Sequence, residues 1–164
     1  MSAYHKSVLQ KEAVDFLHIK KESIYIDATI GGGGHSEEII KRGGKVLAID
    51  RDEEAIERLK RKNLKNVTLV CRNFSNIKNI AQENGISKVA GIIFDLGVSS
   101  HQLDEAVRGF SFKKDGPLDM RMDKRIQVTA YDLVNNLERR RLHEIIQDFG
   151  QEKPDEQKKP LKSE

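Results

Sequence analysis

The chain of 164 residues contains no tryptophan, a single cysteine, three prolines and only 5% aromatic residues. Cys71 has no second cysteine to pair with, which excludes an internal disulfide, and its apolar run VTLVC indicates a small buried side chain in a reducing compartment. No run of 18 apolar residues occurs, and the sequence starts without the apolar stretch of a signal peptide. We therefore expect no membrane association and a cytoplasmic location.

Positive charge is concentrated in one segment of an otherwise balanced chain. Hydrophobic residues make up 37% and charged residues 34%, which is typical of a globular protein, and the formal net charge is +3. Between residues 108 and 125 there are six Lys or Arg and three Asp, so this segment alone accounts for the excess. The distribution permits an anionic partner for residues 108–125.

Four apolar runs alternate with helix-like stretches in the first two thirds of the chain. The expected strands are Ile24–Asp27, Val46–Asp50, Val67–Cys71 and Ile92–Leu96. Helices are expected to begin near Ser36, Asp52 and Asn76. Asp52 is expected to cap its helix and to direct Ala55, Ile56 and Leu59 inward, while Asn84-Gly85 ends the last one. The alternation predicts an α/β fold with a parallel sheet covered by helices on both faces.

Further helices are expected on either side of this alternation. The Ser-x-x-Gln spacing predicts a helix from Ser7 to Leu17, with Leu9, Ala13, Phe16 and Leu17 on its inner face. Near the other end, Leu142, Ile145, Ile146 and Phe149 follow helical spacing before Gly150, which predicts a helix with one apolar face to bury. Residues 151–164 contain few apolar side chains, and we expect a disordered tail.

Polar and glycine residues follow the predicted strands at their carboxyl ends, where open parallel sheets bind ligands. Asp27 is followed by four glycines at positions 31–34, and the second strand ends at Asp50. Phe74 follows the third strand, and Asp95 lies near the end of the fourth. A single nucleoside-shaped ligand would contact all four strand ends.

Each of these features also has a purely structural interpretation. The glycines could form only a tight connection, Asp50 could cap a helix, and Phe74 could belong to the core. His35 either contacts the ligand or caps the following helix. The glycines lack a following Gly-Lys-Ser/Thr and do not match Gly-x-Gly-x-x-Gly, which disfavours a phosphate loop and a nicotinamide-dependent reductase. S-adenosylmethionine, which has no pyrophosphate, fits the pattern better, and no metal site is expected.

The basic segment alternates aromatic and cationic side chains, a combination that stacks bases and neutralises phosphates in looped or single-stranded RNA. The candidate RNA-contacting residues are Arg108, Phe110, Phe112, Lys113, Lys114 and Arg121. The alternative is a surface loop whose two phenylalanines pack into the core. The run Arg139–Arg141 either binds phosphates or forms a solvated helix face.

Long stretches of residues 5–152 resemble the ribosomal RNA small-subunit methyltransferase H family, also called MraW. The matching stretches are His5-x-x-Val8-Leu9, Asp27-Ala28-Thr29 through Gly33-Gly34-His35-Ser36, Ala48 to Asp52, Asp95 to Ser100, and Arg108 to Phe112 through Asp115 to Asp123. The resemblance implies a Rossmann-like class I methyltransferase fold followed by a helical segment. It also implies transfer of a methyl group from S-adenosyl-L-methionine to N4 of a cytidine in 16S (small-subunit) ribosomal RNA.

By the same resemblance, a set of residues near the strand ends would bind the cofactor. The set comprises Gly33, Gly34, His35, Asp50, Phe74, Asp95 and Gln102. A cytosine amine is a weak nucleophile and needs a nearby acceptor, for which Asp95 is the catalytic candidate, although it could equally be a cofactor ligand. The chain departs from the family at His101, where relatives usually have Pro.

Members of that family are about twice as long, and their later sheet strands have no counterpart in this chain. We expect a cofactor-binding domain over residues 1–105, a basic loop and partial substrate segment over 106–150, and the tail over 151–164. The Ile92–Leu96 strand would then have an unpaired edge, which we expect a second copy, the basic segment or the Leu142–Phe149 helix to cover. The partner is small-subunit ribosomal RNA or the small ribosomal subunit. The alternative function is a truncated, non-catalytic module that binds S-adenosylmethionine or RNA.

Overall fold

A four-stranded parallel sheet forms the centre of the computed structural model, which describes residues 9–150. The strands are β1 (Ile24–Asp27), β2 (Lys45–Asp50), β3 (Val67–Cys71) and β4 (Gly91–Ile93), in the order β3-β2-β1-β4. The central β1 places Ile26 level with Leu47 of β2 on one side and Ile92 of β4 on the other. The predicted α/β class is confirmed.

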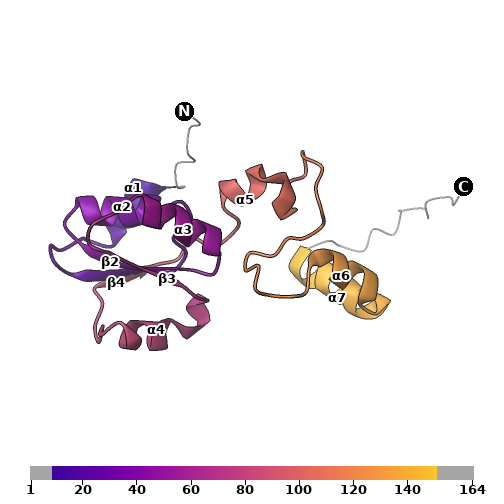
Figure 1. Cartoon of the computed structure of the whole chain (residues 1–164). Coiled ribbons are helices and arrows are strands. Elements are labelled where there is room, and N and C mark those ends of the chain that lie inside the picture. Colours follow the sequence, from indigo (N-terminus) through magenta and orange to yellow (C-terminus); the bar gives the residue numbers. More distant parts are fainter. Residues whose placement is uncertain (1–8, 151–164) are drawn as a thin grey trace, which may run out of the picture.

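Helices cover both faces of the sheet, as predicted. Three of them, α1 (Gln10–Phe16), α2 (Gly34–Lys41) and α3 (Glu53–Arg61), lie on one face, and α4 (Ile77–Glu83) lies on the other (Figure 1). Successive side chains of a strand point to opposite faces, so Tyr25 packs with α2 and α3 while Ile26 packs with α4. Asp52 caps α3 through the N–H of Glu54, and Ala55, Ile56 and Leu59 are buried, as predicted.

Two helices do not bury the faces expected of them. In α1 the buried residue is Val14, whereas Leu9 and Phe16 are exposed, and the part of the expected helix before Leu9 lies outside the described residues. In α7 (Arg139–Gly150) no residue is buried, and both Ile146 and Phe149 are exposed. The apolar stripe of α7 is therefore only partly covered, with Leu142 and Ile145 half-buried.

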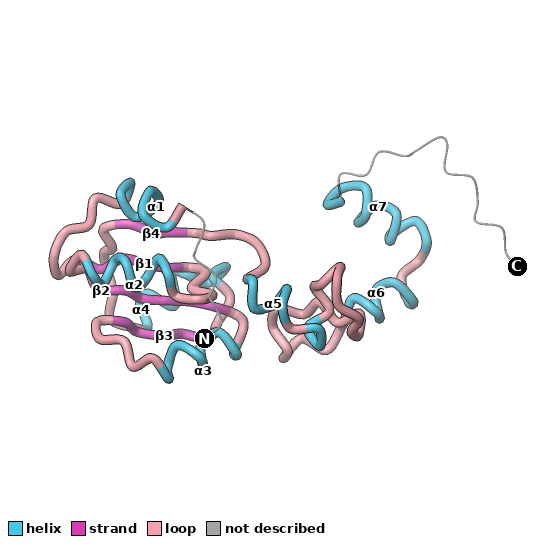
Figure 2. The backbone as a smooth tube through the Cα atoms, turned by 90° about the horizontal axis from the view of Figure 1, so that it is seen from above, coloured by secondary structure: helices cyan, strands magenta, loops and turns pink. Residues whose placement is uncertain are grey.

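The fourth strand is shorter than predicted because its last residues leave the sheet. The N–H of Asp95 donates to Thr29 Oγ1 at 2.7 Å, so this residue bonds to a side chain and not to a neighbouring strand. Among residues 9–150, β4 pairs only with β1, and Phe94 and Leu96 are exposed. The expectation that the basic segment or the last helix covers this edge is wrong. Lys124 and Arg125 of the basic segment bond to Glu54 and to the carbonyl of Cys71, on the β2 and β3 side of the sheet. Both α6 (Ala130–Asn136) and α7 lie away from the sheet (Figures 1 and 2).

The chain leaves the sheet at the carboxyl ends of the strands. There α5 (Ser100–Asp104) and a short 3₁₀ helix (Ala106–Arg108) precede the basic loop and α6 (Figure 2). The 151–164 tail lies outside the described residues. Within residues 9–150, no helix is both long enough and apolar enough to cross a lipid bilayer.

Candidate functional site

Asp50 links the ends of the two central strands. Its Oδ2 accepts the N–H of Gly31 at 2.9 Å, and its Oδ1 accepts the N–H of Asp52 at 2.9 Å. Burial raises the pKa of the Asp50 carboxyl, and these two backbone hydrogen bonds partly oppose that rise. Since Asp52 occupies the cap of α3, Asp50 is free of that role, and each of its oxygens retains one acceptor site.

The glycine run adopts a conformation that requires glycine at two positions. Gly31 has φ +47° and Gly33 has φ +86°, the left-handed region that is costly for other residues. A Cβ on Gly33 would lie 2.6 Å from Cδ2 of buried Leu59, whereas a Cβ on Gly32 would meet nothing within 4 Å. The loop therefore packs tightly on its inner side and leaves open space beside Gly32. Gly34 begins α2, and its carbonyl accepts Gln10 Nε2 at 2.5 Å.

His35 and Asp95 come together from different strand ends. His35 lies in the first turn of α2, is only 5% exposed, and has its Nδ1 3.9 Å from Asp95 Oδ2. Its Nε2 is buried without a hydrogen-bond partner. The Asp95 side chain is half exposed, and its backbone is held by Thr29. The pair combines a buried ring with an unmet hydrogen bond and an accessible carboxylate.

Asp27, the last residue of β1, lies next to the His35–Asp95 pair, and no role was predicted for it from the sequence. Its carboxylate is 1% exposed and accepts Ser36 Oγ at 2.7 Å and the N–H of Thr29 at 3.3 Å. Burial raises the pKa of Asp27, and the hydrogen bond from Ser36 counteracts it. This arrangement could have been predicted from the sequence. A polar residue at the end of a buried strand needs a hydrogen-bond donor close by, and Thr29 and Ser36 follow Asp27 at short distances along the chain.

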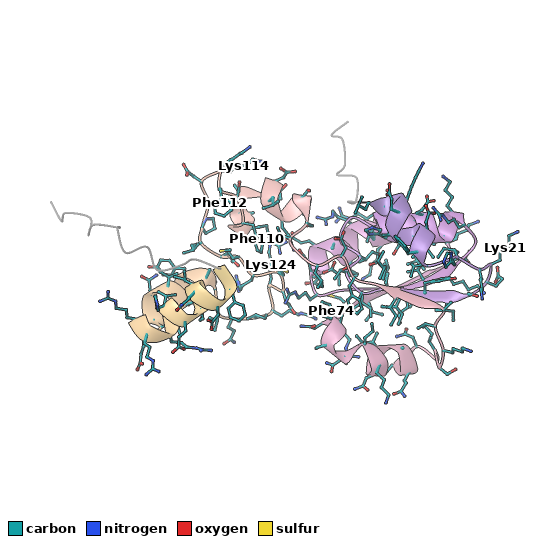
Figure 3. The ribbon with its side chains drawn as sticks, turned by 180° about the vertical axis from the view of Figure 1, so that it is seen from behind. Lys21, Phe74, Phe110, Phe112, Lys114 and Lys124 are labelled. Atoms are coloured by element: carbon teal, nitrogen blue, oxygen red, sulfur yellow. The ribbon has the colours of Figure 1, made fainter. Side chains whose placement is uncertain are left out.

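Phe74 is half-buried and contacts another aromatic ring at the same edge. It opens a 3₁₀ helix (Phe74–Asn76) after β3 and packs against the α4 side of the core. Its ring meets that of Phe94 edge to face, with centroids 5.5 Å apart. The interpretation of Phe74 as part of the core is therefore confirmed for one side of its ring, and its contact with a ligand stays a prediction (Figure 3).

Gln102 is buried and fully engaged within the protein. Its Oε1 accepts the N–H of Ser99 at 3.0 Å, completing a capping box at the start of α5. Its Nε2 donates to Asp52 Oδ2 at 2.7 Å. Gln102 therefore lies against the corner between β2 and α3, and Asp52 lies between it and Asp50.

Arg108 lies in the interior, 1% exposed, beside the same corner. Its guanidinium pairs with Asp52 at 3.0 Å and with Glu54 at 2.6 Å. Burial alone would lower the pKa of this guanidinium, but the hydrogen bonds and charges of Asp52 and Glu54 outweigh it and raise the pKa. Protein groups enclose Arg108, so an RNA phosphate cannot reach it in this arrangement.

The remaining candidates for RNA contact differ in how available they are. Phe112 is fully exposed, whereas Phe110 is 9% exposed, so one phenylalanine packs inward and the other points out (Figure 3). No hydrogen bond or ion pair of the Lys113 side chain is found within residues 9–150, while Lys114 Nζ donates to the carbonyl of Asp104 at 2.5 Å. Arg121 is held by both oxygens of Asp119, and its hydrogen bonds lower the pKa of Asp119 to about 2.

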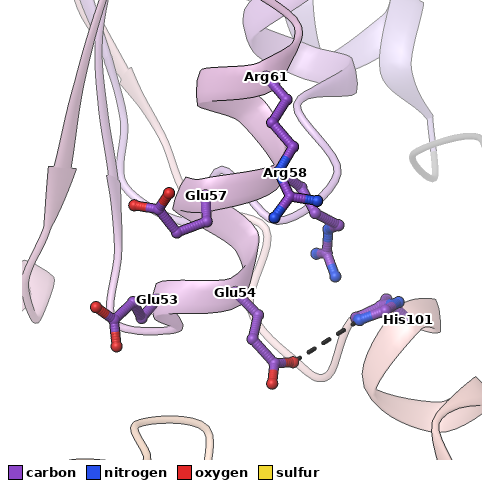
Figure 4. Close-up of a pocket in the computed structure, with 6 residues that line it drawn as sticks. All are labelled: Glu53, Glu54, Glu57, Arg58, Arg61 and His101. Carbon is purple, nitrogen blue, oxygen red and sulfur yellow. Dashed lines mark ion pairs between the residues drawn. The ribbon is translucent and has the colours of Figure 1, made fainter.

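Two hollows adjoin the site. One, of about 450 Å³, lies between α3 and α5, where His101 Nε2 is 3.8 Å from Glu54 Oε2 and Arg58 and Arg61 reach toward the same space (Figure 4). The other, of about 590 Å³, runs between α4 and β4. Neither hollow is lined by Asp50, His35 or Phe74, so contacts rather than an enclosed cavity relate the strand ends. Among residues 9–150, no group of three His, Cys, Asp or Glu side chains could hold a metal ion.

The parallel sheet with an acid, a glycine turn and an aromatic residue at its carboxyl edge defines an α/β protein of the kind that binds ligands at strand ends. The sequence matches the MraW methylase family model over residues 2–159. The chain belongs to this family.

Curated relatives extend well beyond the region that this chain shares with them. Ribosomal RNA small subunit methyltransferase H from Clostridium botulinum (strain Kyoto / Type A2) is 50% identical over 158 residues, which are 93% of this chain and 51% of the relative. The protein of the same name from Halothermothrix orenii is 50% identical over 154 residues, 91% of this chain and 50% of the relative. The chain spans about half the length of the curated relatives it matches.

Solved structures with a similar arrangement include an rRNA methylase from Streptococcus thermophilus, with 28% identity and a TM-score of 0.42, covering 52% of this chain and 53% of that one. A putative methyltransferase from Streptococcus mutans, solved in complex with SAH, has 31% identity and a TM-score of 0.36. It covers 47% of this chain and 46% of the other.

Proposed function

We propose that this chain binds S-adenosylmethionine at the carboxyl ends of β1, β2 and β4 and forms the cofactor-binding part of a methyltransferase. Its proposed acceptor is N4 of a cytidine in small-subunit ribosomal RNA. The observation that carries the proposal is the family match over residues 2–159, because relatives that are 50% identical to this chain over the aligned region are named small-subunit ribosomal RNA methyltransferases. We place the domain boundary at residue 105, directly after α5.

The chain's own residues fit such a cofactor. Asp50 retains an acceptor site on each oxygen, which suits the hydroxyl groups of a ribose. The open space beside Gly32 allows a ligand to approach the backbone near His35, which we place beside the methionine portion. Phe74 presents its exposed part to an adenine. Gly33 and Gly34 contribute through the shape of the loop, and Gln102 through its bond to Asp52.

The reaction makes modest demands on the protein. S-adenosylmethionine, when bound, supplies an electrophilic methyl group on sulfur, so alignment of the acceptor is a major contribution. Asp95 would accept a hydrogen bond from the cytosine amine and take up the proton that this amine loses as its bond to the methyl carbon forms. Half exposure of the Asp95 carboxylate leaves it reachable by a substrate.

The basic loop would contact the RNA. Phe112, fully exposed, is suited to stacking on a base, and Lys113 and Lys114 to neutralising phosphates. Phe110 and Arg121 would act by fixing the loop. A ribosomal substrate supports a cytoplasmic location. Pairing of two copies along β4 would cover the exposed strand edge, and sedimentation can test whether the protein forms such a dimer.

The binding half of the proposal is tested by calorimetry with S-adenosylhomocysteine. We expect wild-type binding and at least a tenfold loss in Asp50→Ala, because the ribose loses its acceptor; Asp15→Ala, which removes an exposed carboxylate on α1, is the matched control. Equal affinity in wild type and Asp50→Ala, or no binding by the wild type, would refute the assignment.

The catalytic half is tested by incubating the protein and labelled S-adenosylmethionine with small ribosomal subunits that lack the modification. Label on cytidine supports the enzyme. Binding of cofactor and RNA without transfer supports a non-catalytic module instead.

A further inference from the structure

The buried guanidinium of Arg108 contacts two parts of the site at once. On one side, its Nη2 is 3.0 Å from Asp52 Oδ2 and its Nη1 is 2.6 Å from Glu54 Oε2. On the other side, Nη2 donates to the carbonyls of Arg121 at 3.0 Å and Met122 at 3.3 Å. Only arginine has enough donors in a fixed fork to serve both sets of acceptors.

The first of these contacts leads to the ribose acceptor. Asp52 is 3% exposed, and its N–H holds Asp50 Oδ1 at 2.9 Å. Its carboxylate also accepts Gln102 Nε2, so Arg108 supplies the positive charge that this buried anion needs. Displacement of the guanidinium would therefore disturb the turn that places Asp50.

The second contact leads to the basic loop. The carbonyl of Arg108 accepts the N–H of Met120 at 3.0 Å, which adds to the side-chain bonds to residues 121 and 122. Next to it, Gly109 has φ +74°, and a Cβ there would lie 2.3 Å from the carbonyl oxygen of Pro117. The two ends of the loop from 109 to 122 are thus closed on Arg108 and its neighbour.

We propose that Arg108 is a positioning residue that couples the methyl-donor site to the RNA-facing loop. A ligand held by Asp50 fixes the β2–α3 corner and with it Arg108, and Arg108 fixes the loop that carries Phe112 and Lys113. Coupling between two sites is reciprocal, so bound RNA also strengthens binding of the donor. The inference rests on the proposed function, because it assigns Asp50 to the donor and the loop to RNA.

Affinities for a small-subunit ribosomal RNA fragment, measured with and without saturating S-adenosylhomocysteine, test the coupling. For the wild type we expect S-adenosylhomocysteine to tighten RNA binding at least about fivefold, the lower end of usual coupling strengths. Arg108→Lys keeps the charge beside Asp52 but cannot also reach both carbonyls. We expect this variant still to bind each ligand measurably on its own and to lose the enhancement.

The control is Arg125→Gln, which removes one positive charge from the basic segment, residues 108–125. Arg125 pairs with Asp123, is half exposed, and does not contact Asp52. We expect this variant to weaken RNA binding to the same extent with and without S-adenosylhomocysteine. If Arg108→Lys does not fold, Glu54→Gln replaces it in the test. This variant removes the carboxylate that lies 2.6 Å from Arg108 Nη1, and because Glu54 is more exposed than Asp52 the fold should tolerate the change. We expect it to reduce the enhancement at least twofold.

The possible failures are distinct. A wild type that does not bind S-adenosylhomocysteine or the RNA refutes the proposed function and this inference with it. A wild type that binds both without enhancement refutes the inference alone. If the wild type and Arg108→Lys show the same enhancement, Arg108 has only a structural role as a member of a buried ion pair. The same conclusion follows from an unchanged enhancement in Glu54→Gln if that variant is used instead.

Discussion

Replacement of Gly33 by alanine should destabilise the fold through backbone strain and core crowding together. The left-handed φ of +86° costs an alanine about 1–2 kcal/mol. The new Cβ would lie 2.6 Å from Cδ2 of Leu59, which is 1% exposed, and overpacking of a core costs about 1–3 kcal/mol. The smaller backbone entropy of unfolded alanine offsets about 0.4–1 kcal/mol. The net loss of unfolding free energy is about 1–5 kcal/mol, a fall in Tm of roughly 2–20 °C for a chain of this size.

The matched control is Gly32→Ala, one residue away in the same loop. A Cβ at Gly32 meets nothing within 4 Å, so we expect its unfolding free energy to stay within about 1 kcal/mol of wild type. Urea unfolding followed by circular dichroism measures both variants. The new methyl group at position 32 occupies the open side of the loop, where it should weaken S-adenosylhomocysteine binding without loss of stability. Equal stability of Gly33→Ala and Gly32→Ala would show that the strain and the contact with Leu59 are not real.

Two further changes test the buried and charged parts of the site. Ser36→Ala removes the 2.7 Å hydrogen bond to buried Asp27 and should lower the free energy of unfolding by about 1–3 kcal/mol in urea titration, whereas exposed Ser87→Ala should leave it unchanged. Because the pKa of Asp119 falls to about 2 beside Arg121, its stabilising contribution is present above pH 4 and is lost as the pH falls toward 2. With solvent screening the loss is roughly 1 kcal/mol, and an Asp119→Asn variant with the same pH dependence as wild type would contradict it.

Apolar runs locate the strands well, because the central strands β1 and β2 are buried on both faces and the edge strand β3 is partly buried. Ile24–Asp27 and Val67–Cys71 match the observed β1 and β3 to the residue. The fourth strand stops at Ile93 because the backbone of Asp95 bonds to the Thr29 side chain, a tertiary contact that no local pattern contains. Tertiary contacts also decide the outcome for α1 and α7. Their apolar faces predict which side chains could be buried, but the local sequence does not show which other element would pack against them.

The candidate site could be predicted in outline from the strand ends, but not the partners of its charged residues. Asp50 lies where the strand pattern predicts, and Asp52 takes the cap. Arg108, read from the sequence as a surface cation, pairs with acids 56 and 54 residues earlier in the chain. Charge in a sequence does not distinguish a solvated cation from a buried one, because the distinction depends on acceptors brought close only by the fold.

The bare side of β4 affects how solutions of the protein behave. Among residues 9–150 the outer side of β4 has no partner strand, so its N–H and C=O groups can form a template onto which a neighbouring molecule adds a strand. The exposed side chains of Phe94 and Leu96 favour such a contact. The strand has only three residues, fewer than the six or seven of segments that stack into amyloid. Concentrated samples should therefore show reversible clustering by light scattering that disappears on dilution, and not fibres.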